Sequence, residues 1–247
     1  MFFSYNGVSV FYKRNMGLGT PIILMHGWGG SNVSFSGAYE YLCGLNRDVI
    51  AVDFPGFGAS DMPGSEWGID DYAACIEELI SAIKLNKAVL VGHSFGGRVA
   101  ICLSDKEWVE SIVLVDSAGL KPHFSLKKTI KVRRYKRAKK AGKDLSGYGS
   151  ADYLALPENM QSVFVRVVNT HLDDRLKNIT CPVLIIWGKR DRETPPYMAW
   201  RLRRKIADST LVFLDGGHFA YAESQVKFNL ILAEFTKGGK ECLFGRQ

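Results

Sequence analysis

Short apolar runs alternate with helix-like patterns along most of the chain. The runs that are apolar throughout lie at 22–25, 49–52, 88–91, 112–115, 183–187 and 211–214. Strands buried on both faces have this character, whereas half-exposed strands alternate. Between the second and third runs, apolar residues from Ile69 to Ile83 recur at steps of three and four, which predicts an amphipathic helix. The pattern predicts an α/β fold with a mostly parallel, twisted sheet and helices on both faces.

The first twelve residues predict an antiparallel β-hairpin that leads into this sheet. Asn6-Gly7 lies between alternating apolar positions, and this dipeptide favours a two-residue hairpin turn. A secretory signal would instead show a basic start and an unbroken apolar run. No apolar segment is long enough to cross a bilayer, so we expect no transmembrane helix.

The rhythm of strand and helix breaks between the fourth and fifth of these runs. The segment 118–180 holds no convincing buried strand but does hold an apolar helical face that includes Phe164 and Val168. We interpret 118–180 as a helical cap, or lid, inserted after the sixth strand, with 1–117 and 181–247 forming the core. Ligands bind at the carboxyl edge of α/β sheets, so Phe164 and Val168 are candidate substrate contacts. A purely structural excursion is the alternative.

The net charge of +7 comes from one stretch of the chain. Eleven Lys and Arg residues and no acid lie between Lys121 and Lys143, and subtracting them from the 32 basic residues leaves 21 against 25 acids. Such a run is most often a solvated helical face. Weak association of 121–143 with an anionic surface, or binding of an anionic substrate, is the alternative, and nucleic-acid binding is not expected.

The cysteines predict a reducing environment. The five are scattered and odd in number, with no CxxC pair (Cys43, Cys75, Cys102, Cys181 and Cys242). Disulfide frameworks and zinc ribbons need closer, paired spacing. We therefore expect a cytoplasmic protein with no metal site and no cofactor, and the chain also lacks the glycine spacing of nucleotide-binding loops.

A nucleophile is predicted where the third of these runs ends. Gly92-His93-Ser94-Phe95-Gly96 matches G-x-S-x-G, follows the strand 88–91 and precedes a predicted helix from Gly96 to Ser104. In a nucleophile elbow the serine sits on a strained strand-to-helix turn, and the glycines avoid clashes. The turn directs Ser94 toward solvent beside a helix amino terminus, which favours developing negative charge.

A serine hydroxyl needs a base, and the base needs a carboxylate that orients it. His218 follows the last strand, and Asp191 follows the strand at 183–187. Both lie at the carboxyl edge of the sheet, and the order Ser, acid, His is the one this architecture uses. Asp116, just after 112–115, is the rival acid. We favour Asp191 because we expect its strand to be adjacent to the one that leads to His218.

These motifs together resemble the α/β-hydrolase fold superfamily, in its serine-nucleophile branch. The resemblance spans most of the chain and rests on five motifs: His26-Gly27-Trp28-Gly29-Gly30, Asp53-Phe54-Pro55-Gly56-Phe57-Gly58-Ala59-Ser60, Gly92-His93-Ser94-Phe95-Gly96-Gly97, Trp187-Gly188-Lys189-Arg190-Asp191 and Gly217-His218. It implies that the backbone N–H groups of Trp28 and Phe95 form an oxyanion hole. Two such amides stabilise the charge of a tetrahedral intermediate.

The triad predicts acyl transfer to water, but a fold does not fix a substrate. The leading hypothesis is a hydrolase of small or medium carboxylic esters. A carbon–carbon bond hydrolase is the second, and a lyase similar to the menaquinone-pathway synthase is the third, because Arg98 follows Ser94 by one helical turn and is a candidate carboxylate contact. A non-catalytic ligand-binding protein on the same scaffold is the alternative from another class. The sequence predicts no oligomeric state.

Overall fold

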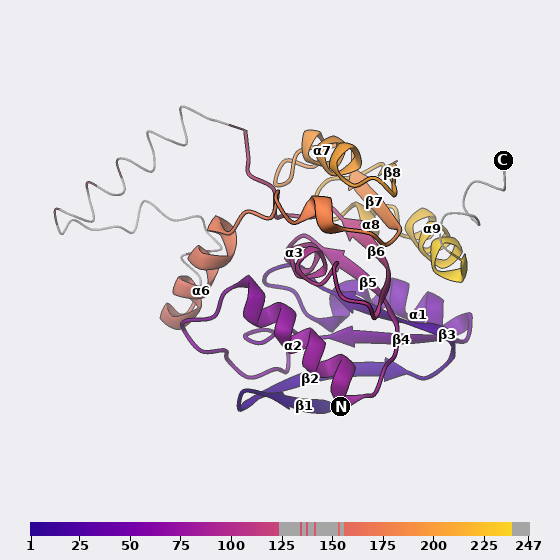
Figure 1. Ribbon diagram of the computed structural model, residues 1–247, viewed down its shortest axis with the longest axis horizontal. Helices are drawn as coiled ribbons and strands as arrows, with labels where there is room; N and C mark the ends of the chain where they lie inside the picture. Colours follow the sequence, from indigo (N-terminus) through magenta and orange to yellow (C-terminus); the bar gives the residue numbers. More distant parts are fainter. Residues whose placement is uncertain (124–133, 135–136, 138–140, 142–152, 154–155, 239–247) are drawn as a thin grey trace.

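An eight-stranded sheet runs through the described part of the molecule (Figure 1). The computed structural model describes residues 1–123 and 156–238, together with residues 134, 137, 141 and 153. The strands are β1 (Phe2–Tyr5), β2 (Val8–Asn15), β3 (Leu18–Met25), β4 (Arg47–Val52), β5 (Ala88–His93), β6 (Val109–Val115), β7 (Val183–Gly188) and β8 (Ser209–Leu214). Their order across the sheet is β1-β2-β4-β3-β5-β6-β7-β8.

Most neighbouring strands are parallel. From β4 through β3, β5, β6 and β7 to β8 every pair runs in the same direction, and only β1 with β2 and β2 with β4 are antiparallel. The Asn6-Gly7 turn joins β1 to β2, and both turn residues have positive φ angles, as a type I′ hairpin turn requires. The predicted hairpin and parallel sheet are both confirmed.

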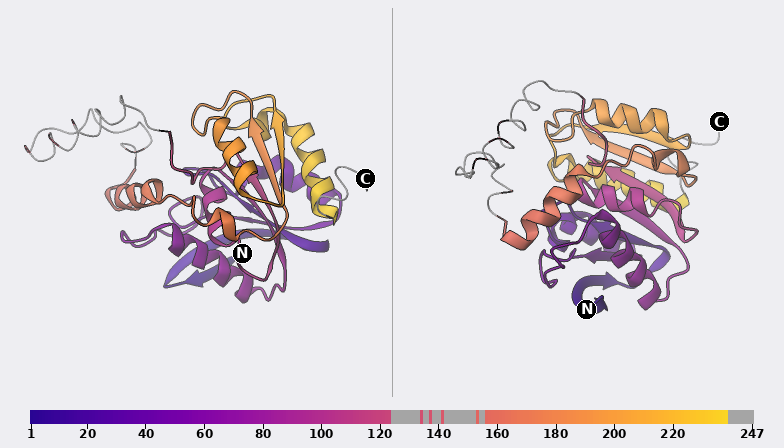
Figure 2. Two further views of the ribbon diagram at one scale, coloured as in Figure 1. Left: turned by 45° about the horizontal axis from the view of Figure 1, so that its top comes forward. Right: turned by 60° about the vertical axis from the view of Figure 1, so that its left-hand side comes forward.

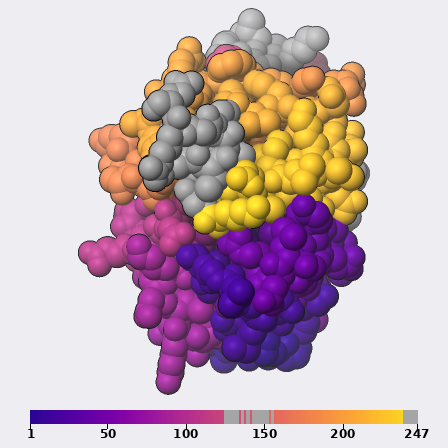
Figure 3. All heavy atoms as spheres, turned by 90° about the vertical axis from the view of Figure 1, so that its right-hand side faces the viewer, coloured from indigo at the N-terminus to yellow at the C-terminus, as the bar shows by residue number. Residues whose placement is uncertain are grey.

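Helices cover both faces of the sheet (Figure 2). The α-helices are α1 (Ser36–Gly44), α2 (Ile69–Ala82), α3 (Phe95–Cys102), α6 (Glu158–Asn169), α7 (Tyr197–Lys205), α8 (Ala220–Glu223) and α9 (Gln225–Gly238), and the 3-10 helices are η1 (Asn32–Phe35) and η2 (Leu176–Asn178). One face packs against α2, α3 and α7, and the other against α1, α8 and α9. Figure 3 shows α9, in yellow, lying against the N-terminal half of the chain.

Successive residues of each central strand point to opposite faces. In β3, Ile23 and Met25 belong to the core beneath α2 and α3, whereas Ile22 and Leu24 belong to the core beneath α1 and α9. All four are at most 1% exposed. This double burial is the reason the strands are apolar throughout in sequence.

Two helix boundaries differ from the sequence-based prediction. Helix α3 starts at Phe95 rather than Gly96 and ends at Cys102 rather than Ser104. Helix α6 ends at Asn169. The Thr170 hydroxyl donates a hydrogen bond to the Arg166 carbonyl oxygen, and Thr170 itself is extended. The helix ends where the Thr170 backbone leaves the helical region, and the Thr170 hydroxyl satisfies a carbonyl of the last turn.

The predicted cap falls only partly within the described residues. Its helix α6 packs on the core through Met160, Val163 and Val167, all nearly fully buried. Much of 118–180, including most of the basic run at 121–143, lies outside the described residues. The boundaries of the cap and the role of the run therefore stay predictions. No helix in the described ranges combines the length and apolar character needed to cross a bilayer.

Candidate active site

Ser94 occupies a strained turn between β5 and α3. Its φ of 47° and ψ of −102° lie outside the regions that non-glycine residues favour. The Ser94 N–H donates to the Val115 carbonyl oxygen, and the Ser94 carbonyl accepts from Ala118 N–H, so both flanks of the turn are anchored to the chain around β6. Backbone strain of this kind persists only where the surroundings enforce it, and it is typical of functional sites.

The two glycines of G-x-S-x-G are required by close backbone contacts. A Cβ on Gly92 would overlap the Gly96 carbonyl, and a Cβ on Gly96 would overlap the Met25 carbonyl at the end of β3. The Gly96 N–H also donates to the His26 carbonyl oxygen at 3.1 Å. The elbow therefore lies directly against the loop that follows β3.

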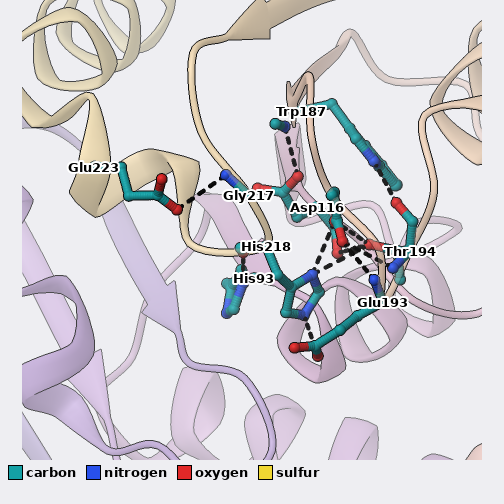
Figure 4. A network of polar contacts seen from close by, with 10 residues as sticks. His93, Asp116, Trp187, Glu193, Thr194, Gly217, His218 and Glu223 are labelled. Carbon is teal, nitrogen blue, oxygen red and sulfur yellow. Dashed lines mark hydrogen bonds and ion pairs between the residues drawn. The ribbon is translucent and has the colours of Figure 1, made fainter.

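The structure brings His218 and Asp191 together. His218 Nδ1 lies 2.9 Å from Asp191 Oδ2, and both side chains are almost completely buried (Figure 4 shows the His218 ring within this network). The two residues come from the loops after β8 and β7, which are adjacent parallel strands. A buried carboxylate at Nδ1 fixes the tautomer of the ring and leaves Nε2 available for proton transfer.

Thr194 completes the binding of the Asp191 carboxylate, a role that the sequence analysis missed. Asp191 Oδ1 accepts from the N–H groups of Glu193 and Thr194, and the Thr194 hydroxyl donates to Oδ2 at 2.6 Å. Burial alone would raise the pKa of Asp191, but the hydrogen bonds from His218 and Thr194 outweigh it and hold the pKa below its ordinary value. Asp191 is therefore an anion at neutral pH. An Asp that binds backbone N–H groups two and three residues on is a known turn pattern.

Asp116, the rival acid, does not contact His218. It is fully buried, and its Oδ1 accepts from Gly188 N–H at 2.7 Å. Burial first, and the nearby Asp191 carboxylate as well, raise the pKa of Asp116 to about 9 despite the Gly188 hydrogen bond. Asp116 is thus a neutral acid at pH 7, and the negative charge beside His218 Nδ1 comes from Asp191.

Two further histidines shape the site from beneath. The His93 Nε2–H donates to the His218 carbonyl oxygen at 2.8 Å, which anchors the His218 backbone to the end of β5. His26 accepts the Phe54 N–H at Nε2 and lies 2.7 Å from the Gly27 carbonyl through Nδ1. Burial lowers the pKa of His93 to about 3 and that of His26 to about 4, so both rings are neutral at pH 7.

The backbone amides of Trp28 and Phe95 both adjoin Ser94. Phe95 is the next residue, and a Cβ on Gly27, the residue before Trp28, would lie 3.5 Å from Ser94 Cβ. Within the described ranges neither N–H has a hydrogen-bond acceptor. Two donors beside Ser94 without acceptors among the described residues would suit an oxyanion, which could accept both hydrogen bonds.

Ser94 and His218 open into one cavity of about 680 Å³. The candidate contacts Arg98, Phe164 and Val168 line it as well, and so do the aromatic residues Trp28, Phe95, Phe219 and Tyr221. No hydrogen bond joins the Ser94 hydroxyl to the His218 ring in the described part of the chain, a contact that often tightens only when substrate binds.

Arg98 is buried and reaches from α3 to the predicted cap. Its guanidinium donates to the carbonyl oxygens of Val167 and Thr170 at 2.9 and 2.7 Å, at the C-terminal end of α6. Burial lowers the pKa of Arg98 to about 10, which leaves it charged at neutral pH. Among the described residues no carboxylate pairs with it, so its charge is offset chiefly by helix-end carbonyls.

Glu193 is a second residue that sequence analysis did not single out. Its Oε2 lies 3.4 Å from His218 Nε2, and it also lines the cavity (Figure 4). One acidic residue in an exposed turn gives no distinguishing sequence signal. Among the described residues, no three His, Cys, Asp or Glu side chains are placed to hold a metal ion together.

Comparison with known proteins identifies the family and the fold of the chain. The chain is 28% identical to the AB hydrolase superfamily protein YisY of Bacillus subtilis, over 91% of this chain and 94% of that one. It is 24% identical to 2-hydroxy-6-oxo-2,4-heptadienoate hydrolase of Pseudomonas putida, over 90% and 91% of the two chains. The crystal structure of the enol-lactonase of Burkholderia xenovorans superposes with a TM-score of 0.77 at 20% identity, covering 96% of this chain and all of that one. The model of the alpha/beta hydrolase family matches residues 22–229, and the chain belongs to this family and is a hydrolase.

Proposed function

We propose that this enzyme hydrolyses small or medium carboxylic esters through a covalent acyl-enzyme formed on Ser94. His218 would act as the general base and acid, and Asp191 would orient and stabilise it. The observation that carries the proposal is the buried contact of 2.9 Å between Asp191 Oδ2 and His218 Nδ1, with His218 facing the same cavity as Ser94. A carboxylate, an imidazole and a strained serine at one cavity match the requirements of acyl transfer.

The reaction would proceed in two halves. The Ser94 oxygen attacks the ester carbonyl carbon while its proton moves to His218 Nε2, and the resulting oxyanion accepts hydrogen bonds from the N–H groups of Trp28 and Phe95. The carbon–oxygen bond then breaks, and the proton on Nε2 passes to the leaving alkoxide. Water then attacks the acyl-enzyme and gives a proton to Nε2. The bond between the acyl carbon and the Ser94 oxygen breaks, the proton on Nε2 passes to that oxygen, and the acid leaves.

The cavity supports an acyl group of modest size. A volume of about 680 Å³ lies within the range of small-molecule sites, and aromatic and aliphatic side chains form much of its wall. Phe164 and Val168 of α6 belong to that wall and would contact the substrate. We further propose that 118–180 form a cap over the core.

Contacts of α6 with the core support this cap. The side chains of Ser162 and Arg166 donate to the Ser65 carbonyl oxygen, and Arg98 donates to the carbonyl oxygens of Val167 and Thr170 at the C-terminal end of the helix. Cytoplasmic location remains part of the proposal. It rests on the scattered cysteines, of which Cys43, Cys75, Cys102 and Cys181 are free in the described residues.

Arg98 favours a second candidate, cleavage of a carbon–carbon bond in a carboxylate substrate. A charged guanidinium in the cavity wall, with no carboxylate partner among the described residues, suits an anionic substrate group. The name of the Pseudomonas putida relative also points to a carboxylate. Arg98→Met would then weaken turnover of an anionic ester far more than that of a neutral ester of equal size.

Steady-state hydrolysis of p-nitrophenyl esters of graded length and charge tests the leading proposal. We expect turnover by the wild-type enzyme, and we expect Ser94→Ala and His218→Ala each to lower kcat by at least about 10³-fold while leaving the fold intact. Equal hydrolysis by wild type and Ser94→Ala would contradict it. Mass spectrometry that finds a retained ligand in an inactive wild-type protein would favour the non-catalytic binding protein.

A further inference from the structure

Glu193 presents a carboxylate to the free nitrogen of His218. It belongs to the same turn as Asp191, whose Oδ1 accepts the Glu193 N–H at 2.8 Å. The two carboxylates lie on opposite sides of the ring, because Asp191 contacts Nδ1 and Glu193 Oε2 lies 3.4 Å from Nε2. Figure 4 shows the Glu193 side chain beneath the His218 ring.

The position of this carboxylate relative to a substrate follows from the chemistry. His218 Nε2 must come within about 3 Å of the leaving-group oxygen to give it a proton. A carboxylate oxygen 3.4 Å from the same nitrogen therefore lies within about 7 Å of that oxygen. A charged group two or three bonds beyond the leaving-group oxygen would therefore come close to Glu193.

The surroundings of Glu193 suit a cation. Its side chain is 66% exposed, and no Lys or Arg pairs with it in the described ranges. Phe219, the residue after His218, is half exposed, lines the same cavity and lies with its ring centre 5.5 Å from that of His218. An aromatic face and a carboxylate are the two groups that bind alkylammonium ions in proteins.

We propose that Glu193, with the ring of Phe219, forms a leaving-group subsite that favours esters of amino alcohols and of quaternary ammonium alcohols. The inference rests on the proposed function, since it needs His218 Nε2 to protonate a leaving group. It leaves the acyl side of the cavity, where Arg98 lies, open to a neutral or an anionic acyl group.

Butyrylcholine and 3,3-dimethylbutyl butyrate test the subsite, because they differ only in a quaternary nitrogen that is carbon in the second ester. We expect wild-type kcat/KM to favour the choline ester. The ratio of the two values should fall about three- to fivefold in Glu193→Gln and invert in Glu193→Lys, as fits a largely exposed charge pair. The preference should weaken as salt is added in the wild type, but not in Glu193→Gln.

Glu107→Gln is the matched control. Glu107 is exposed and does not line the cavity, so its substitution should leave the ratio unchanged. A wild-type enzyme that prefers the neutral ester would overturn the inference. Equal losses of kcat/KM for both esters in Glu193→Gln would overturn it as well, because Glu193 would then act only on His218 and not on the leaving group. An enzyme that hydrolyses neither ester, and whose Ser94 does not react with a fluorophosphonate, contradicts the proposed function itself and the subsite with it.

Discussion

His218 Nδ1 lies 2.9 Å from Asp191 Oδ2, and this contact joins the loop after β8 to the loop after β7. The neighbouring carboxyl of Asp116 is fully buried but binds Gly188 N–H instead of the ring. We therefore expect Asp191→Asn to lower kcat/KM for an ester by about 10³- to 10⁴-fold, because an amide leaves the His218 tautomer unfixed.

Asp116→Asn is the companion variant. It retains an oxygen that accepts the Gly188 N–H, and it should keep kcat/KM within about tenfold of wild type. Both variants should show native circular dichroism. If Asp116→Asn is the more damaging of the two in ester kinetics, the assignment of Asp191 is wrong.

The raised pKa of the buried Asp116 carboxyl predicts how stability changes with pH. Its pKa rises from 3.8 to about 9 on folding, chiefly because it is buried. Between these values the folded state holds one proton more than the unfolded state, so this carboxyl lowers stability as pH rises, by about 1.4 kcal/mol per pH unit. The unfolding free energy of Asp116→Asn should lack that slope between pH 6 and 8. Urea titrations of both proteins across this range measure the difference, and parallel slopes would contradict the buried neutral acid.

His26 should change the stability with pH in the opposite direction. Burial lowers its pKa from 6.5 to about 4, so below pH 6.5 the unfolded state takes up a proton that the folded state refuses. Its contribution to stability is therefore lost as pH falls from 6.5 toward 4, by about 1.4 kcal/mol per pH unit. His26→Gln should show a shallower acid limb in thermal unfolding, because the amide does not titrate. An unchanged limb would mean that His26 is already protonated in the folded protein.

Gly188 positions the loop that carries His218. A Cβ there would overlap the Gly217 carbonyl oxygen, so Gly188→Ala must displace the chain just before His218. We expect a loss of stability of about 1–3 kcal/mol and a lower kcat. Gly44→Ala, at the end of α1 where a Cβ meets nothing within 4 Å, should leave both unchanged or raise stability slightly. Denaturant unfolding and ester kinetics on both variants make the comparison.

The sequence was enough to predict the candidate site residues that directly follow strands. Ser94, Asp191 and His218 each follow an apolar run, and the carboxyl ends of parallel strands meet at one edge. The order of the strands did not follow from the sequence. β4 lies between β2 and β3, and nothing local in its apolar run specifies those neighbours.

The supporting residues were harder to find because their roles depend on three-dimensional proximity. The Thr194 hydroxyl reaches Asp191 only because the turn between them folds back. Glu193 lies beside His218 although 25 residues separate them in the sequence. Asp116 and Asp191 have the same sequence context, a carboxyl after a buried strand, and their opposite pKa shifts arise from different hydrogen-bond partners.

The most direct test of the central claim is the site at which a fluorophosphonate reacts. Ser94 should displace fluoride from the probe, and intact mass should show one adduct per chain, located by peptide mapping to Ser94. The adduct should be absent in Ser94→Ala and should form far more slowly in His218→Ala. Equal labelling of wild type and Ser94→Ala, or an adduct on another residue, would contradict the account.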